Sequence, residues 1–179
     1  MRPLRSRDTA CSIGCAGTRG ARTGLSGAEM SNVGTIMSRE PVTCTEDLRL
    51  QQVAALMRSR HVGSVVVVSG EGLTRRPVGV VTDRDIVVEV VATGLDAAAI
   101  TAGDIVVRPA VTAHDSDSLG EAIQKMRSRG VRRLPVVDIR GELVGVLSSD
   151  DLSQALSHEL AMLVRVAEHQ PSQEARVRP

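Results

Sequence analysis

Apolar and polar positions follow the same order in two segments of the chain, residues 42–86 and 111–152. Each segment contains a stretch in which apolar residues recur every three or four positions, which is the spacing of one buried helix face. These stretches, 47–60 and 118–129, both end in Met-Arg-Ser-Arg. The pattern predicts two related helices, with buried stripes at Leu50, Val53, Ala54 and Met57 in the first copy and at Leu119, Ala122, Ile123 and Met126 in the second.

Two short runs rich in β-branched residues follow each predicted helix, and such residues favour strands. The first run covers 62–68 or 131–137, and the second covers 78–81 or 143–147. One copy cannot bury both faces of its own sheet, so the two copies must pack on each other. We therefore expect an α/β (α+β) fold of two pseudo-symmetric β-α-β-β-α repeats packed sheet to sheet.

Each copy closes with a glycine, a hydroxyl residue and an aspartate at the same spacing before a helix. The first copy has Gly79, Thr82 and Asp85, and the second has Gly145, Ser148 and Asp151. A hydroxyl followed three residues later by a carboxylate is also the pattern of a helix capping box. Spacing alone therefore leaves open whether these residues bind a ligand or only cap a helix.

The segment after Leu152 continues as a helical pattern with an apolar stripe that one repeat does not need for its own core. This stripe is a candidate dimer contact, although ordinary core packing explains it nearly as well. Its members are Leu156, Leu160, Leu163, Val164 and Ala167.

The amino-acid composition argues against several classes of function. The 22 basic and 21 acidic residues nearly cancel, which argues against a nucleic-acid-binding protein. Phe, Tyr and Trp are absent, so a bound purine must lie between aliphatic side chains. The longest apolar run, residues 62–68, is far too short to cross a bilayer, so we expect no membrane segment. Lys125 is the only lysine among many arginines, a bias that suggests a GC-rich bacterial genome.

Residues 1–29 are basic and rich in Gly, Ser and Thr, and we interpret them as a disordered tail without an export signal. The odd number of cysteines, 3, then favours a reducing cytoplasm over a disulfide framework. Cys11 and Cys15 could begin a metal site, but no second ligand pair follows at a suitable spacing. We therefore predict no metal and a cytoplasmic location.

The order of helix, two strands and Gly-x-x-[Thr/Ser]-x-x-Asp before a helix resembles the CBS motif, and the pair resembles a Bateman module over roughly residues 33–160. Residues 81–88 and 92–96 are similar to small bacterial stand-alone CBS pairs of the hypoxia- or stress-response type. The resemblance divides the chain into a first motif (30–90), a linker or helix (91–104), a second motif (105–160) and a C-terminal helix end and tail (161–179).

The resemblance implies two clefts between the motifs that hold AMP, ATP or another adenosyl ligand, with no cofactor required. Asp85 and Asp151 would hold ribose, with Thr82 and Ser148 beside the phosphates and Thr43 and Thr112 also against the ligand. Residues 62–64 and 131–133 would present backbone groups to the base, and arginine forks would meet the phosphates. The implied ligand-binding residues are Thr43, Val62, Gly63, Ser64, Thr82, Arg84, Asp85, Thr112, Val131, Arg132, Arg133, Ser148 and Asp151.

The two implied clefts are chemically unequal, because Gly63 and Ser64 stand where the second copy has Arg132 and Arg133. The arginine pair also fits a plain solvated basic patch. The aspartates near each turn fit a magnesium or phosphotransfer site, although carboxylates at helix starts more often offset the helix dipole. One cleft is expected to dominate.

No nucleophile lies in a recognisable elbow near His114 and Asp115, so we predict no catalytic residues and no enzyme activity. The function that fits best is a homodimeric regulatory module that senses an adenine nucleotide and signals to an unidentified partner. The alternatives are a ligand-free protein-interaction or stress-response module and a subunit that regulates an enzyme in trans.

Overall fold

The computed structural model describes residues 32–70, 72 and 74–177, with side chains described as far as Arg165. The predicted tail over 1–29, including Cys11 and Cys15, lies outside these residues. Within them no helix is both long and apolar enough to span a membrane. The elements are α1 (Val33–Ile36), β1 (Thr43–Thr45), α2 (Leu50–Arg60), β2 (Ser64–Ser69), β3 (Arg76–Thr82), α3 (Asp83–Ile86), the π-helix η1 (Val87–Val91), α4 (Ala102–Ile105), β4 (Ala113–His114), α5 (Leu119–Arg129), β5 (Arg133–Val137), β6 (Leu143–Ser148) and α6 (Ser149–Val177).

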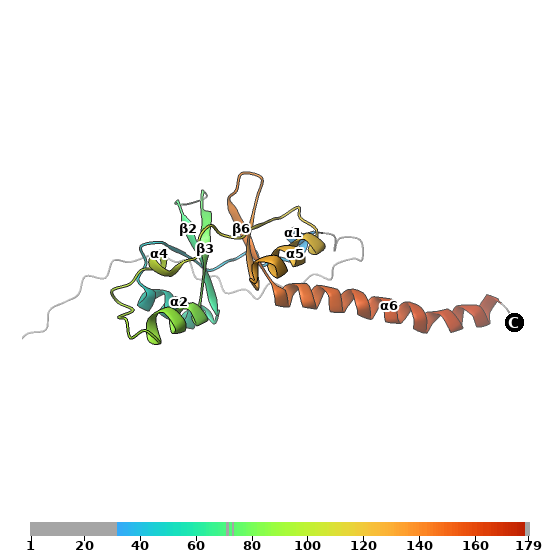
Figure 1. Cartoon of the computed structure of the whole chain (residues 1–179). Coiled ribbons are helices and arrows are strands. Elements are labelled where there is room, and N and C mark those ends of the chain that lie inside the picture. Colours follow the sequence, from blue (N-terminus) through green and yellow to red (C-terminus); the bar gives the residue numbers. More distant parts are fainter. Residues whose placement is uncertain (1–31, 71, 73, 178–179) are drawn as a thin grey trace, which may run out of the picture.

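Two three-stranded sheets of identical topology confirm the predicted repeat. The strand orders are β1-β2-β3 and β4-β5-β6, with the first pair of each sheet parallel and the second antiparallel. Figure 1 shows the two halves side by side, with β3 and β6 at the centre and α6 running outward from the second half. The predicted α/β (α+β) class with paired β-α-β-β-α repeats is therefore correct.

The two long repeat helices differ from prediction in which residues they bury. The first begins at Leu50 rather than Asp47. Ala54 is exposed, because the face of α2 that packs on the core contains Val53 and Leu56 instead. In α5, Ile123 is 39% exposed instead of buried, because it borders an open groove between α5 and α6. The predicted stripes are thus wrong at one position in each helix.

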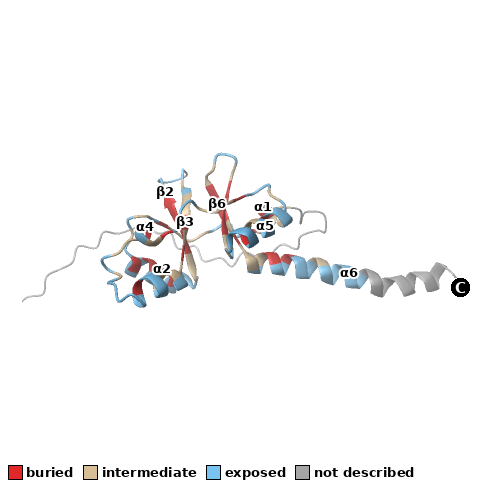
Figure 2. Cartoon of the chain, in the orientation of Figure 1, coloured by how far each residue is buried: buried red, intermediate tan, exposed pale blue. Residues whose placement is uncertain are grey.

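Strand β2 is buried on both faces, and this explains its uninterrupted valine run. Val65 and Val67 belong to the core beneath α2, whereas Val66 and Val68 lie in a small apolar cluster with Leu143 from the second half. Successive side chains of a strand point to opposite faces, so one run of valines serves both contacts. Figure 2 shows the buried residues on the strands, on the inner sides of helices such as α2 and α4, and on the first turns of α6.

Each half completes its core with a short helix that precedes the other half in the sequence. Helix α1 contributes Val33 and Met37 to the core of the second half, and α4 contributes Ala102 and Val106 to the core of the first. The two helices dock alike. The amide of Val33 donates to the carbonyl of Asp117 at 2.8 Å, and that of Ala102 donates to the carbonyl of Leu48 at 2.8 Å. The two halves are therefore interlocked: α1 contacts β4, β6 and α6 of the second half, and α4 contacts β1 of the first.

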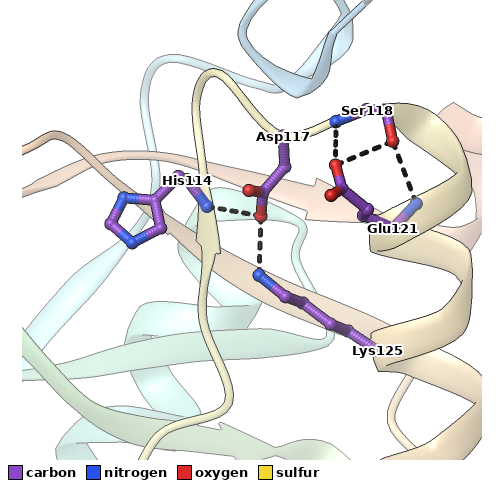
Figure 3. A network of polar contacts seen from close by, with 5 residues as sticks. All are labelled: His114, Asp117, Ser118, Glu121 and Lys125. Atoms are coloured by element: carbon purple, nitrogen blue, oxygen red, sulfur yellow. Dashed lines mark hydrogen bonds and ion pairs between the residues drawn. The ribbon is translucent and has the colours of Figure 1, made fainter.

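A polar network holds the loop that receives α1 (Figure 3). Asp117 accepts from the backbone amide of His114 at 2.9 Å and from Lys125 at 2.6 Å. Partial burial raises the pKa of Asp117, but the hydrogen bonds from Lys125 and His114 outweigh it, so the net pKa is lowered. Ser118 and Glu121 form the predicted capping box, in which hydrogen bonds from the Ser118 amide and hydroxyl lower the pKa of Glu121. The network is structural, and it uses the amide of His114 rather than its imidazole ring.

Candidate ligand-binding clefts

The first hydroxyl-carboxylate turn is a capping box that joins the end of β3 to α3. Oδ2 of Asp85 accepts from the amide of Thr82 at 2.8 Å and from its hydroxyl at 2.7 Å. In return, Thr82 Oγ1 accepts from the amide of Asp85 at 3.2 Å. The other carboxylate oxygen, Oδ1, has no hydrogen bond to the described part of the protein.

The second turn repeats this geometry between β6 and α6. Oδ2 of Asp151 accepts from the amide and hydroxyl of Ser148 at 2.9 and 2.6 Å. Thr101 and Asp104 form a similar box at α4, where no ligand is expected. A capping box by itself therefore does not mark a ligand site in this chain, and what distinguishes Asp85 and Asp151 is the surface beside them.

The glycine of each turn is explained by close crossing of another segment. A Cβ on Gly79 would come within 2.7 Å of the carbonyl oxygen of Val107, and one on Gly145 would come within 2.7 Å of the carbonyl oxygen of Ser38. Ser38 also forms an antiparallel bridge with Val146. The crossing segments lead from α1 to Thr43 at the start of β1 and from α4 to Thr112 just before β4, so these glycines help to set where β1 and β4 begin.

The register of the first sheet places three predicted ligand residues on one face. Ser64 pairs with Thr82, and Thr43 pairs with Val66. Directly paired residues share a face, and Val66 lies in the cluster between the halves. The side chains of Thr43, Ser64 and Thr82 therefore project from the face of the first sheet that is turned toward the second half.

The second sheet separates the two predicted arginines. Arg133 pairs with Ser148, and the next residue, Leu134, is buried in the helix-side core, so Arg133 shares the opposite face with Ser148. Arg132 instead lies 3.6 Å from Asp150, and the two side chains are 80% and 79% exposed. Arg133 is thus half-buried on the face between the halves, and Arg132 is on the outside.

The remaining predicted residues serve partly structural contacts. Val62 and Val131 pack against the two cores, and the carbonyl of Gly63 accepts from the amide of Asp83 at 3.1 Å. Arg84 is exposed, and Thr112 is half-buried just before β4. Only the Ser64 end of the first base-facing segment therefore projects directly onto the face between the halves.

The described residues contain no group of three or more His, Cys, Asp and Glu side chains that could hold a metal ion. One oxygen each of Asp85 and Asp151 is already used in a capping box. Cys44 is buried in the first core, and that burial raises the pKa of its thiol to about 11, with a smaller contribution from Asp47. The thiol is therefore protonated at neutral pH and acts as a small apolar side chain.

Sequence reasoning missed one residue of this region, Arg75. Its Nη1 donates to Thr43 Oγ1 at 3.2 Å, and its carbonyl accepts from the amide of Leu143 at 2.8 Å. The residue lies in the turn between 69 and 76, which is longer than the corresponding turn of the second copy at 138–142. Comparing the two repeats therefore offered no signal for it.

Known proteins share this architecture. The CBS protein YhcV of Bacillus subtilis is 32% identical over 133 residues, which cover 74% of this chain and 91% of YhcV. A CBS protein of Pyrobaculum aerophilum, solved in complex with AMP, is 35% identical, covers 73% of this chain and 98% of its own, and has a TM-score of 0.64. Hypoxic Response Protein I, solved with two coordinated zinc ions, is 28% identical, covers 69% and 97%, and has a TM-score of 0.60.

Other curated relatives are longer than the region they share with this chain. An uncharacterised protein of Methanopyrus kandleri is 32% identical, and the match spans 66% of its length. Mycobacterial inosine-5'-monophosphate dehydrogenases are 34% identical, but the match spans only 22% of their length. The family pattern described as "CBS domain" matches residues 33–92 and 102–158. The chain belongs to the CBS-domain family and carries two CBS domains.

Proposed function

We propose that this protein is a non-catalytic regulatory module that binds an adenine nucleotide or another adenosyl ligand between its CBS domains. The observation that carries the proposal is the gathering of Thr43, Ser64 and Thr82 on the face turned toward the second half. Beside them, one carboxylate oxygen of Asp85 has no hydrogen bond to the residues that the structure describes. Hydroxyls and a carboxylate around an aliphatic patch suit a nucleoside.

The chemistry of an adenosyl ligand matches these groups. A carboxylate oxygen can accept from a ribose hydroxyl, and a charge-assisted hydrogen bond of this kind is among the stronger ones. The base would lie against aliphatic residues such as Val66 and Val80, since the chain has no aromatic side chain. The AMP complex of the similar Pyrobaculum protein supports this choice of ligand.

We further propose that the two clefts bind unequally. Ser64 in the first half and Arg133 in the second occupy equivalent positions, each paired with the hydroxyl residue of its turn. A neutral hydroxyl and a guanidinium favour different ligand groups, because only the guanidinium is charged and donates two parallel hydrogen bonds to phosphate oxygens.

Removing each carboxylate in turn tests the ribose assignment. We expect Asp85→Ala or Asp151→Ala, whichever serves the dominant cleft, to weaken AMP binding roughly tenfold or more, since a hydrogen bond to a charged group contributes about 1.5–3 kcal/mol. Isothermal titration calorimetry with AMP, ATP, NAD and S-adenosylmethionine measures the affinities.

The matched control is Asp104→Ala, which breaks the same kind of capping box at α4, a helix that contributes no predicted ligand residue. It should lower the melting temperature about as much as the other two variants, because each loses one cap, but leave AMP affinity unchanged. Equal AMP affinity in all three variants and the unchanged protein would refute the ribose assignment. No heat with any ligand at millimolar concentration would refute the ligand-binding function.

A second candidate function, protein interaction, is favoured by helix α6. Leu156, Leu160, Leu163 and Val164 are between 45% and 66% exposed, and their spacing places them on one stripe. The stripe continues into a groove of about 410 Å³ lined by Ile123, Met126 and Leu152. Spacings of four and three residues are those of a helix pair, so we propose a second copy of this chain as the partner.

A pair of charge substitutions tests the dimer. We expect Leu160→Glu with Leu163→Glu to convert a two-chain mass into a one-chain mass in light scattering coupled to size-exclusion chromatography, because each carboxylate would be buried in an apolar contact. The control, Gln154→Glu with His158→Glu, places two carboxylates on the opposite side of α6 and should stay dimeric. A one-chain mass for the unchanged protein would contradict the proposal.

The regulated partner and the role in a bacterial, cytoplasmic stress response stay predictions.

A further inference from the structure

Arg75 has an environment unlike that of other arginines. Of the arginines in the described part of the chain, Arg75 and Arg133 are half-buried and the rest are exposed. Arg133 lies on the face of the second sheet between the halves. Arg75 comes from the first half, where its Nη1 donates to Thr43 Oγ1 at 3.2 Å. The hydroxyl of Thr43 projects from the face of the first sheet turned toward the second half, so both half-buried arginines lie toward the same inter-domain region.

Within the described residues, the guanidinium of Arg75 has the neutral partner Thr43 and no carboxylate partner. Ion pairs within the described residues join Arg108 to Glu46, Lys125 to Asp117 and Arg132 to Asp150, and Arg75 takes part in none of them. A partly desolvated cation without an anion is unfavourable, and proteins usually pair such groups. An anionic ligand beside Thr43 would remove this imbalance.

The backbone of Arg75 is fixed independently of its side chain. Its carbonyl accepts from the amide of Leu143 in the second half at 2.8 Å. This bond holds the backbone of Arg75 at the junction of the two CBS domains, so the position from which its side chain extends is restrained. In the second copy the turn is shorter. Gly141 stands four residues before Gly145, as Arg75 stands four residues before Gly79, and the arginine of that turn, Arg140, is exposed.

We propose that Arg75 is the phosphate-binding residue of the first cleft, in place of the exposed Arg84, and makes that cleft selective for a nucleotide over the uncharged nucleoside. This inference rests on the proposed function and deepens it. The planar guanidinium of Arg75 would bind two phosphate oxygens, either giving up its hydrogen bond to Thr43 or keeping it alongside the phosphate contact. Asp85 would hold the ribose of the same ligand through its free oxygen.

Comparing AMP with adenosine isolates the phosphate contact. We expect Arg75→Gln to weaken AMP binding roughly tenfold to a hundredfold, the effect of losing hydrogen bonds to a charged group, and to leave adenosine affinity unchanged. Arg75→Lys keeps the charge but loses the planar guanidinium, so its AMP affinity should lie between those of the unchanged protein and Arg75→Gln. The matched control is Arg76→Gln, the exposed neighbour, which should bind AMP like the unchanged protein. Calorimetry gives the affinities, and thermal melting confirms that each variant is folded.

The possible outcomes distinguish a failure of the Arg75 assignment from a failure of the proposed nucleotide-binding function. If the unchanged protein binds AMP and Arg75→Gln binds it equally well, Arg75 is not the phosphate residue, although the nucleotide function stands. Equal losses for AMP and adenosine would mean that Arg75 only supports the fold, and this too would overturn the inference. An unchanged protein that binds neither ligand overturns the proposed function and the inference together.

Discussion

Gly145→Val is expected to destabilise the protein by about 3 kcal/mol, because the new side chain would occupy space already filled by another segment. A Cβ at this position would lie 2.6 Å from Sδ of Met37 and 2.7 Å from the carbonyl oxygen of Ser38. The methionine could move, but Ser38 is held to Val146 by two backbone hydrogen bonds of 2.9 Å. Urea unfolding followed by circular dichroism measures the loss.

Gly120→Ala is the control, since a Cβ at Gly120 would meet no atom closer than 4.0 Å. It lies in α5, where alanine should stabilise the helix by up to about 1 kcal/mol relative to glycine. Gly79→Val should resemble Gly145→Val, because Val106 and Val107 cross it in the same way. An unchanged urea midpoint for Gly145→Val would show that the Ser38 crossing is not tight in solution.

These glycines illustrate what the sequence could and could not predict. Their recurrence six positions before Asp85 and Asp151 was visible, and with it the repeat and the order of helices and strands along each copy. The reason for the recurrence was not visible, because the crossing segments are distant in sequence. The exchange of α1 and α4 was missed for the same reason, although residues 33–37 and 102–106 have the same separation as Met57 and Met126.

The candidate site shows the same limit. The hydroxyl and carboxylate residues could be named from the motif, yet their capping geometry is shared with Thr101 and Asp104, which the motif does not include. Strand alternation could have separated Arg133 from Arg132, but only once the start of β5 was known to within one residue. Arg75 could not be found by comparing the repeats, because it lies in a turn that is longer in the first copy than in the second, and its contact with Thr43 joins residues 32 positions apart.

Val33→Asp is expected to have the largest effect, about 4 kcal/mol, because it places an unpaired carboxylate in a fully buried position. Val33 is fully buried and belongs to the core of the second half with Leu134 and Leu147. Val107→Asp is the control, since Val107 is 80% exposed, and it should change the free energy of unfolding by no more than about 0.5 kcal/mol.

The half of the protein that Val33→Asp destabilises distinguishes an interlocked pair of CBS domains from two independent repeats. If each CBS domain were built from continuous sequence, Val33→Asp would loosen the first half, which it precedes. The packing of α1 predicts the opposite: amides of β5 and β6 should lose protection from hydrogen exchange before those of β2 and β3. Protection lost first in β2 and β3 would contradict the exchange of α1. Loss in the second half would mean that the segment before the first repeat controls the Arg133 and Ser148 side of the inter-domain region.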